Sequence, residues 1–331
     1  MKRDLYWDSL KFVLIYLVVY GHIVPNYSED SRFNMAIFNL IYLFHMPLFI
    51  FISGRFSHIR DREKYKKGIW RLLETYVVFQ VIRSPIYLIT GKSSILGCIV
   101  TPNWILWYLV ALIYWRLLIY YIPESWLKKQ KQMIIGSLCI SLLAGFIPIG
   151  YPFVVQRTLT FLPFFIMGYY STEIDIKQYI SKIPRIVTIP ILGCAFLVLF
   201  LWLNRNLSFV HHCSFPYWGG DFLHVMIRLA ARCVFIPSAI ILSIAVMRLT
   251  PTHQTLAKWG SITMFIYIYH SFAVNFLNAI IKRGYIPQNE LLLFAYSIAI
   301  MLCLLTLSRF RLFNILLNPL TYIKERNKKA C

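Results

Sequence analysis

Long apolar runs recur along this chain, at a length that fits a lipid bilayer. A transmembrane α-helix needs about 20 consecutive, mostly apolar residues. We count about ten runs that meet or approach this length. They cover roughly residues 10–25, 36–54, 72–90, 104–122, 133–149, 158–171, 187–203, 224–247, 261–281 and 290–309. The sequence therefore predicts an all-α integral membrane protein with about ten transmembrane helices.

The composition supports a membrane protein and argues against a soluble one. Hydrophobic residues make up 59% of the 331 residues and charged residues 14%, and the mean hydropathy is +0.62. Soluble domains are about 45–50% apolar and about 25% charged. No loop is long enough to fold alone, so a single transmembrane domain is expected over residues 1–331.

Positive charge is concentrated in alternate loops. The net charge of +21 comes from 34 Lys and Arg against 13 Asp and Glu. One set of alternate loops (1–11, 55–71, 123–132, 172–186, 248–258 and 309–331) holds 24 of the Lys and Arg, and the other set holds 6. The positive-inside rule then places both termini in the cytoplasm. Because this placement accounts for the charge, nucleic acid is not expected as a partner.

The cysteines and one histidine pair offer little support for a metal-binding site. The seven cysteines form no Cys-x-x-Cys pair, so neither a disulfide framework nor a zinc ribbon is predicted. His211-His212-Cys213 lacks a third partner at ligand spacing. We therefore expect no bound metal.

The first apolar run is also compatible with a signal peptide, because it is short and follows Lys2 and Arg3. No small-residue cleavage site follows it, and Lys11 and His22 interrupt it. We therefore expect a retained helix. Asp8 and Lys11 open this helix three residues apart and share a face. Asp8 is read either as a cap and interface anchor or as part of the substrate cavity.

His22 lies near the outer end of the same run, after Gly21. A histidine can accept a proton from an attacking hydroxyl. It can equally be a buried residue that bonds to a neighbouring helix. Gly21 would allow a substrate or another helix to come close. Asp8 cannot orient His22 within one straight helix, because fourteen residues separate them by about 21 Å.

Other polar residues lie in the apolar runs, where they are costly and often functional. His45 precedes Pro47, which removes a backbone donor, so His45 marks either a site or a packed kink. His270 ends an aromatic stripe that is typical of a core or an interface belt. Arg228 and Arg232 share a helix face and suit an anionic group, or alternatively pair with Glu74 or Asp221.

The segment from Arg55 to Arg71 carries seven Lys and Arg. Positive loops of this kind typically set the orientation of a protein in the membrane and attract anionic lipid. It could also dock a phosphate-rich cytosolic ligand such as coenzyme A.

Several of these motifs occur together in a known family. Residues 3–11 and 17–22, followed by 44–54, resemble the first two helices of acyltransferase family 3, which are bacterial membrane O-acyltransferases. The form His45-Met46-Pro47 is most similar to the fucose 4-O-acetylase-like branch. Weaker matches follow in the same order at 106–109, 161–169 and 266–270.

The resemblance implies a ten-helix enzyme of the bacterial inner (cytoplasmic) membrane. It implies acyl-CoA, usually acetyl-CoA, as co-substrate with no bound cofactor, and a sugar hydroxyl of a cell-surface or lipid-linked glycan as acceptor. His22 falls on the family's catalytic histidine, and Lys11 on its basic residue in the same helix. The family's Arg-x-x-Arg element is met only at Arg71, since Gly68 stands at its first position beside Lys67.

On this basis we expect an acetyltransferase with His22 as the catalytic residue. Lys11, Lys67 and Arg71 would hold the acyl-CoA donor. The substrate cavity would be lined by Asp8, His45, Trp107, Arg228, Arg232 and His270. The main alternative is a transporter or flippase for a lipid-linked sugar. The sequence leaves the acceptor, the acyl chain length and the oligomeric state open, a homo-oligomer included.

Overall fold

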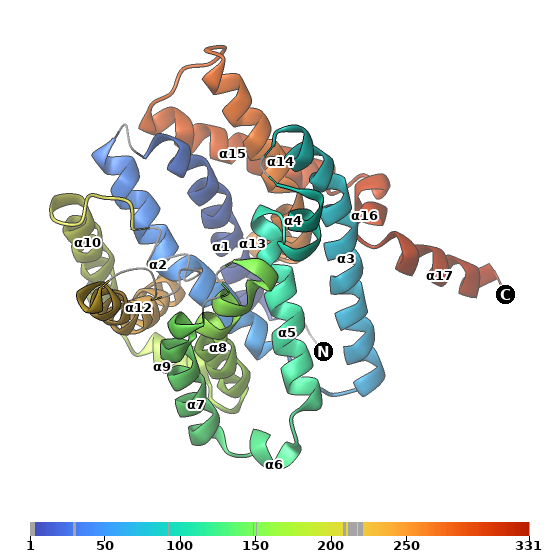
Figure 1. Ribbon diagram of the computed structural model, residues 1–331, viewed down its shortest axis with the longest axis horizontal. Coiled ribbons are helices and arrows are strands. Elements are labelled where there is room, and N and C mark those ends of the chain that lie inside the picture. The colour runs from blue at the N-terminus through green and yellow to red at the C-terminus, as the bar shows by residue number, and fades with distance from the viewer. Residues whose placement is uncertain are drawn as a thin grey trace. The chain divides into compact units, whose positions relative to one another are not determined.

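We analysed a computed structural model of the chain (Figure 1). It describes residues 4–28, 31–91, 93–147, 149, 151–207, 210, 217 and 221–330. Every regular element in these ranges is a helix, and none is a strand. The predicted all-α fold class is therefore confirmed.

Seven helical segments in the described part of the chain are long and apolar enough to cross a bilayer. They are Leu5–Tyr27, Arg32–Arg55, Arg62–Ile89, Trp104–Tyr121, Phe222–Leu249, Thr263–Lys282 and Glu290–Leu307. The three remaining predicted runs are also helical but shorter: Gln130–Phe146, Val155–Tyr170 and Arg185–Leu201. The chain is thus a multi-pass membrane protein, and the count of ten spans stays a prediction.

The chain divides into two compact units, which we describe separately. The first comprises Met1–Phe49, Glu173–His211 and Ala231–Arg309. The second comprises Ile50–Thr172, His212–Ala230 and Phe310–Cys331. The long helices α2 (Arg32–Arg55) and α12 (Phe222–Leu249) contribute residues to both. The single domain predicted over residues 1–331 stays a prediction.

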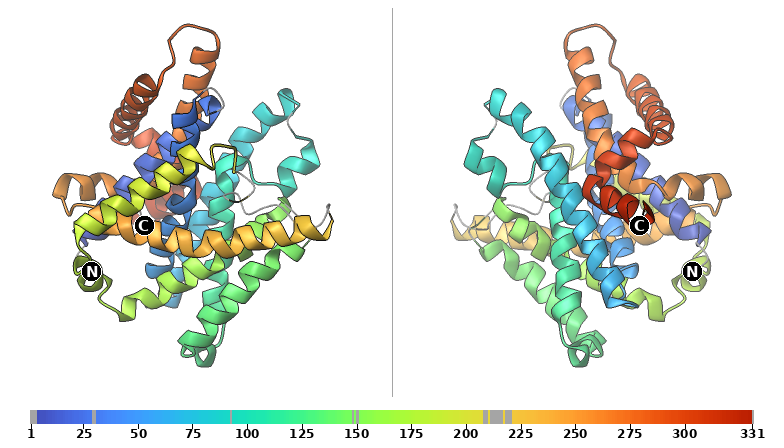
Figure 2. Two further views of the ribbon diagram at one scale, coloured as in Figure 1. Left: turned by 90° about the vertical axis from the view of Figure 1, so that its left-hand side faces the viewer. Right: turned by 90° about the vertical axis from the view of Figure 1, so that its right-hand side faces the viewer.

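Helix α1 (Leu5–Ile23) is buried along much of its length in the first unit. Asp4 begins it by accepting a hydrogen bond from the Tyr6 amide at 3.0 Å. The helix packs against α13 (Gln254–Gly260), α14 (Thr263–Lys282) and α15 (Glu290–Leu307). Figure 2 shows α14 and α15 as a hairpin with the connecting loop at its tip. Leu10, Leu14, Ile15 and Val19 are fully buried in α1.

Hydrogen bonds join chain segments at two ends of the first unit. At one end, Tyr6 Oη donates to the Met247 carbonyl at 2.8 Å, which joins the start of α1 to the end of α12. At the other end, Asn204 Nδ2 donates to the Arg32 carbonyl at 2.8 Å, which joins the end of α10 (Arg185–Leu201) to the start of α2. The start of α1 and the end of α12, which flank two of the positive-rich segments, therefore lie at the same end of this unit.

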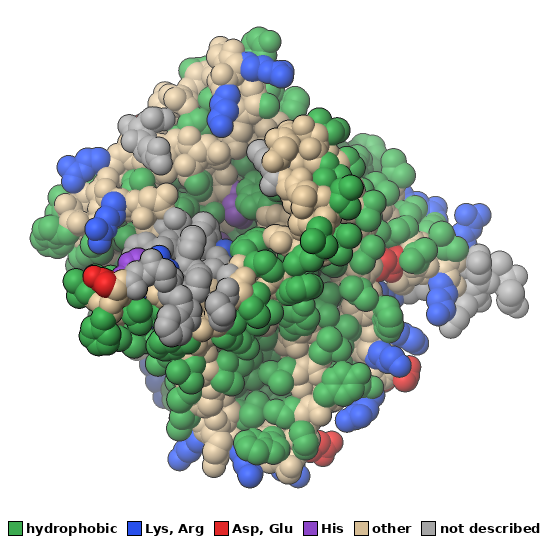
Figure 3. Space-filling view, viewed as in Figure 1, with side chains coloured by type: hydrophobic (Ala, Val, Ile, Leu, Met, Phe, Trp, Pro, Cys, Tyr) green, Lys and Arg blue, Asp and Glu red, His purple; other side chains and the backbone are tan. Residues whose placement is uncertain are grey.

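The second unit is built on α3, α5, α7 and α8. The helices α7 and α8 pack together, and α5 packs against both α3 and α8. Hydrophobic side chains cover α3 and α5 on the face in Figure 3, and Lys and Arg lie at the end near α6. The elements are α3 (Arg62–Ile89), α4 (Ile95–Val100), η2 (Trp104–Leu106), α5 (Trp107–Tyr121), α6 (Glu124–Leu127), α7 (Gln130–Leu143), η3 (Ala144–Phe146), η4 (Pro152–Val154), α8 (Val155–Tyr170), η5 (Ser171–Glu173), α16 (Arg311–Leu317) and α17 (Pro319–Ala330).

Two glycines let α2 and α8 cross closely in the second unit. A Cβ added at Gly54 would lie 2.0 Å from the Phe165 carbonyl oxygen. One added at Gly168 would lie 1.9 Å from the Phe51 carbonyl oxygen. Small residues at helix crossings are the usual means of close packing in membranes.

Asp61 begins α3 outside the apolar segment. Its carboxylate accepts the Lys64 amide at 3.1 Å, and this hydrogen bond lowers the pKa of Asp61 below its usual value. A lowered pKa means that the cap is present above the pKa of the unfolded chain and is lost as the pH falls through the lowered value. The cap is therefore intact at neutral pH.

We expect Gly260→Ala to destabilise the first unit. A Cβ at Gly260 would lie 1.8 Å from the Asp8 carbonyl oxygen, so α13 must move away from α1. The expected loss is about 1–3 kcal/mol of unfolding free energy, the usual cost of overpacking. Thermal unfolding in detergent measures this loss.

Gly193→Ala is the control. A Cβ at Gly193, in α10, would have no atom within 4 Å, so this variant should gain about 0.5–1 kcal/mol of unfolding free energy. Equal stability of the two variants would contradict this packing.

Candidate functional site

His22 lies in the last turn of α1 and is half-buried. Its Nδ1 lies 3.0 Å from the hydroxyl oxygen of Tyr42 on α2. The two rings are nearly perpendicular, at 87°. The chain leaves α1 directly afterwards through η1 (Val24–Tyr27), where Pro25 cannot donate a backbone hydrogen bond. The imidazole is thus held at a helix end and keeps part of its surface accessible.

Gly21 makes this contact possible. An added Cβ would lie 3.1 Å from Cγ2 of Ile41 and 3.4 Å from Cε2 of Tyr42. The absence of a side chain therefore lets α2 come close to α1 at the position before His22. Of the two interpretations of Gly21, the structure shows the close approach of another helix.

His270 and His45 complete a cluster of three histidines. The His270 ring is stacked on that of His22, with centroids 5.3 Å apart and an angle of 23°. The His45 ring lies 4.7 Å from that of Tyr42. His270 is fully buried and His45 is 2% exposed. The structure therefore brings together three of the residues that the sequence singled out.

Hydrogen bonds to backbone carbonyls restrict the tautomers of two of these rings. His45 Nδ1 donates to the Ile41 carbonyl at 2.7 Å, and His270 Nδ1 donates to the Ile266 carbonyl at 3.2 Å. A carbonyl oxygen only accepts, so Nδ1 carries a proton in both rings. For His22 the Tyr42 hydroxyl can either donate or accept, and the tautomer with its proton on Nδ1 donates to Tyr42 Oη and leaves Nε2 as an acceptor. This is the arrangement that a general base requires.

Tyr42 is the candidate site residue that sequence reasoning missed. It lies three residues before His45, so the two share a face of α2. A tyrosine on the same helix face as a buried histidine was the one available signal. The sequence could not show that this face meets the end of α1.

Asp8 and Lys11 form an ion pair in the first two turns of α1. Lys11 Nζ lies 3.0 Å from Asp8 Oδ1. This confirms that they share a face. The cap of α1 is Asp4 rather than Asp8, since Asp4 accepts the Tyr6 amide. Eleven residues of helix separate Lys11 from His22, about 16 Å, so Lys11 does not touch the histidine cluster.

Four of the other predicted site residues belong to the second unit. Lys67 and Arg71 are exposed on α3, and Trp107 begins α5. The Arg157 guanidinium lies 4.5 Å from the centroid of the Trp107 ring. Arg228 is half-buried on the part of α12 that belongs to this unit.

Arg232 lies one turn after Arg228, in the first unit, and is 6% exposed. The two carboxylates considered as partners for this arginine pair each accept a backbone amide, and the pairing with arginine stays a prediction. Glu74 accepts the Thr321 amide at 3.0 Å, and Asp221 accepts the His224 amide at 2.9 Å. Both carboxylates thus accept backbone amides in the first turns of helices.

His211, His212 and Cys213 lie outside the residues that the structure describes. Within the described ranges, no group of three His, Cys, Asp or Glu side chains could hold a metal ion. The expectation of no metal stays a prediction.

Comparison with known proteins decides the family. The acyltransferase domain of acyltransferase family 3 matches residues 4–309. The chain belongs to acyltransferase family 3. This family member is also similar to nodulation protein NolL of Sinorhizobium fredii, at 46% identity over 56 residues, and to nodulation protein NolL of Mesorhizobium japonicum, at 43% over 59 residues.

Those two matches are short. They cover 16% and 17% of this chain, and 15% and 16% of the two NolL proteins. No solved structure matches the chain. The family match therefore carries the assignment: the chain is a multi-pass membrane protein of acyltransferase family 3. Its predicted place in the fucose 4-O-acetylase-like branch stays a prediction.

We expect Tyr42→Phe to lower acyl transfer about tenfold. The change keeps the ring but removes the hydroxyl that positions His22, which costs about 1–1.5 kcal/mol for a typical hydrogen bond. Initial rates in membranes with matched protein amounts measure the loss.

Tyr16→Phe is the matched control for this prediction. It also removes a tyrosine hydroxyl, that of half-buried Tyr16, whose described partner is Ser297 at 2.9 Å rather than His22. The same loss in both variants would show that the effect is only structural.

Proposed function

We propose that the chain is an O-acetyltransferase of the bacterial inner membrane. It would move an acetyl group from cytosolic acetyl-CoA to a hydroxyl of a cell-surface or lipid-linked sugar. The observation that carries the proposal is the His22–Tyr42 contact at 3.0 Å, at an accessible helix end of a family 3 acyltransferase. Both termini would face the cytoplasm, as the 24-to-6 distribution of Lys and Arg favours.

The reaction needs one proton acceptor. His22 Nε2 takes the proton of the sugar hydroxyl while its oxygen attacks the thioester carbonyl carbon. The bond between that carbon and the coenzyme A sulfur then breaks, and the proton on His22 passes to the departing thiolate. Tyr42 holds the imidazole in place during both transfers. The products are the acetylated sugar and free coenzyme A.

The other predicted site residues have proposed roles in binding. Lys11, Lys67 and Arg71 would contact the acidic parts of acyl-CoA. Asp8, His45, Trp107, Arg228, Arg232 and His270 would shape the cavity. Among them, His45 and His270 have the strongest support, because they lie against Tyr42 and His22.

His22→Gln should reduce acetyl transfer by at least about a hundredfold, the usual contribution of a general base. Glutamine can still bond to Tyr42 but cannot take the proton. Release of free coenzyme A by the purified protein with acetyl-CoA and a glycan extract measures the rate. His224→Gln, a matched change of a half-buried histidine at the start of α12, should keep the parent rate. An unchanged rate in His22→Gln would refute the assigned role.

Deleting the gene should remove acetyl groups from surface glycans, and mass spectrometry detects this as the loss of one acetyl mass per modified sugar. Expression of the parent chain should restore the mass, and His22→Gln should not. A flippase without chemistry would instead change the amount of surface glycan and leave the mass per unit unaltered.

A further inference from the structure

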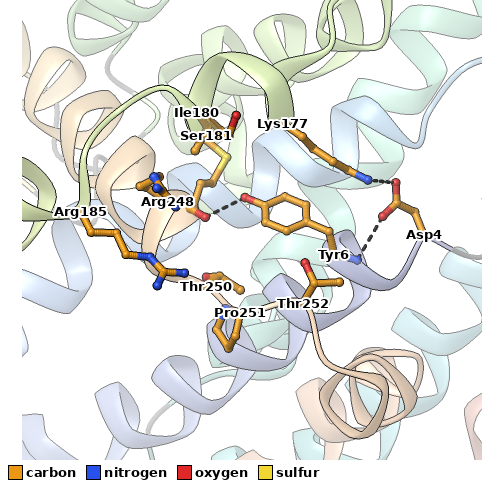
Figure 4. A pocket seen from close by; sticks show the side chains of 11 residues that line it. Asp4, Tyr6, Lys177, Ile180, Ser181, Arg185, Arg248, Thr250, Pro251 and Thr252 are labelled. Atoms are coloured by element: carbon orange, nitrogen blue, oxygen red, sulfur yellow. Dashed lines mark hydrogen bonds and ion pairs between the residues drawn. The ribbon is translucent and has the colours of Figure 1, made fainter.

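A cavity of about 320 Å³ opens at the end of the first unit where α1 begins (Figure 4). Four segments line it: the start of α1, α9 (Ile176–Ser181), the start of α10 and the chain after α12. Neither His22 nor Lys11 is among its lining residues. It is therefore separate from the histidine cluster.

The cavity carries an excess of positive charge. Lys177, Arg185 and Arg248 line it, with Asp4 as the one carboxylate among the residues that line it. Their formal charges sum to +2. Such a surplus at a concave, partly enclosed site favours an anion.

The three cations are positioned in different ways. Lys177 forms an ion pair with Asp4, and Arg248 Nε donates to the Ile183 carbonyl at 2.6 Å. Arg185 is exposed and extends in Figure 4 from the start of α10 toward Thr250. A backbone hydrogen bond therefore positions Arg248, while Arg185 lines the cavity from an exposed position. The planar guanidinium suits bidentate contact with a phosphate.

The position of the cavity relative to apolar surface indicates the source of that phosphate. Arg185 is the first residue of α10, and exposed apolar side chains follow it at once. Ile186 is 80% exposed, Val187 47% and Ile189 59%. In a membrane protein these side chains face lipid, so Arg185 lies at the depth of the headgroups.

We propose that this cavity binds the phosphate of an anionic phospholipid, with the acyl chains lying along the exposed apolar face of α10. Arg185 and Arg248 contact the phosphate, and Lys177 supplies further positive charge. The lipid would hold α9, α10 and the end of α12 together at the start of α1. This goes beyond the proposed acetyl transfer and does not depend on it.

Lipid retention tests the proposal. The full chain is purified in a mild detergent with equal amounts of phosphatidylglycerol and phosphatidylcholine, and native mass spectrometry counts the lipids that stay bound. The parent should retain phosphatidylglycerol preferentially. Arg185→Gln should weaken this retention about fivefold, which corresponds to about 1 kcal/mol for one cation near a charged surface. Arg283→Gln is the control, because Arg283 is exposed just after α14 and is not among the residues that line the cavity.

A second variant and a competition experiment keep the test decisive. Lys177→Gln should also weaken retention, while its melting temperature in a zwitterionic detergent shows that it is folded. Unchanged retention in both variants would overturn the proposal. Displacement of phosphatidylglycerol by millimolar inorganic phosphate or adenosine 3′,5′-bisphosphate would assign the cavity to a soluble phosphate compound and would also overturn it. The readout needs no acyl transfer, so it is independent of His22.

Discussion

Helix α1 makes close contacts through glycines near both of its ends, and the position of the histidine cluster depends on them. Near its start, Gly260 of α13 lies against the Asp8 carbonyl, where a Cβ would be 1.8 Å away. At its end, Gly21 lets Ile41 and Tyr42 of α2 approach. Contacts of this kind in a lipid solvent come from packing rather than from a hydrophobic force between helices. They fix the direction in which His22 leaves the helix, which is the precision that a catalytic group needs.

The choice of groups around His22 follows from the cost of charge in a membrane. An aspartate in place of Tyr42 would add a charge at membrane depth, where insertion of a charged side chain costs about 2.5–3.5 kcal/mol. A tyrosine hydroxyl can position the imidazole without that cost. The carboxylate and the ammonium of α1 are instead paired with each other, Asp8 with Lys11, in the first turns of the helix. Ionic groups therefore lie near the helix start and neutral polar groups near the helix end.

The sequence predicts where the helices lie better than it predicts which residues come into contact between them. Helices occur at all ten predicted positions, because apolar length alone indicates them. The three shorter ones show why a count of spans is harder: α8 has 16 residues and is buried on most sides, so its apolar character reflects packing as much as lipid. Among site residues, His22, His45 and His270 were found because histidine is conspicuous in an apolar run. Tyr42 was not, since tyrosine is common in such runs and only the α1–α2 contact singles it out.

The stacking of His22 on His270 restricts how much charge the cluster can hold. At 5.3 Å, two imidazolium rings would repel each other strongly in surroundings of low polarity. His270 is fully buried, and its Nδ1–H bond to the Ile266 carbonyl fixes the ring beside His22. In the proposed mechanism His22 accepts the hydroxyl proton, and this repulsion then disfavours a second cation on His270. A cluster that holds one added proton at a time matches a transfer in which the hydroxyl gives up one proton and the thiolate receives one.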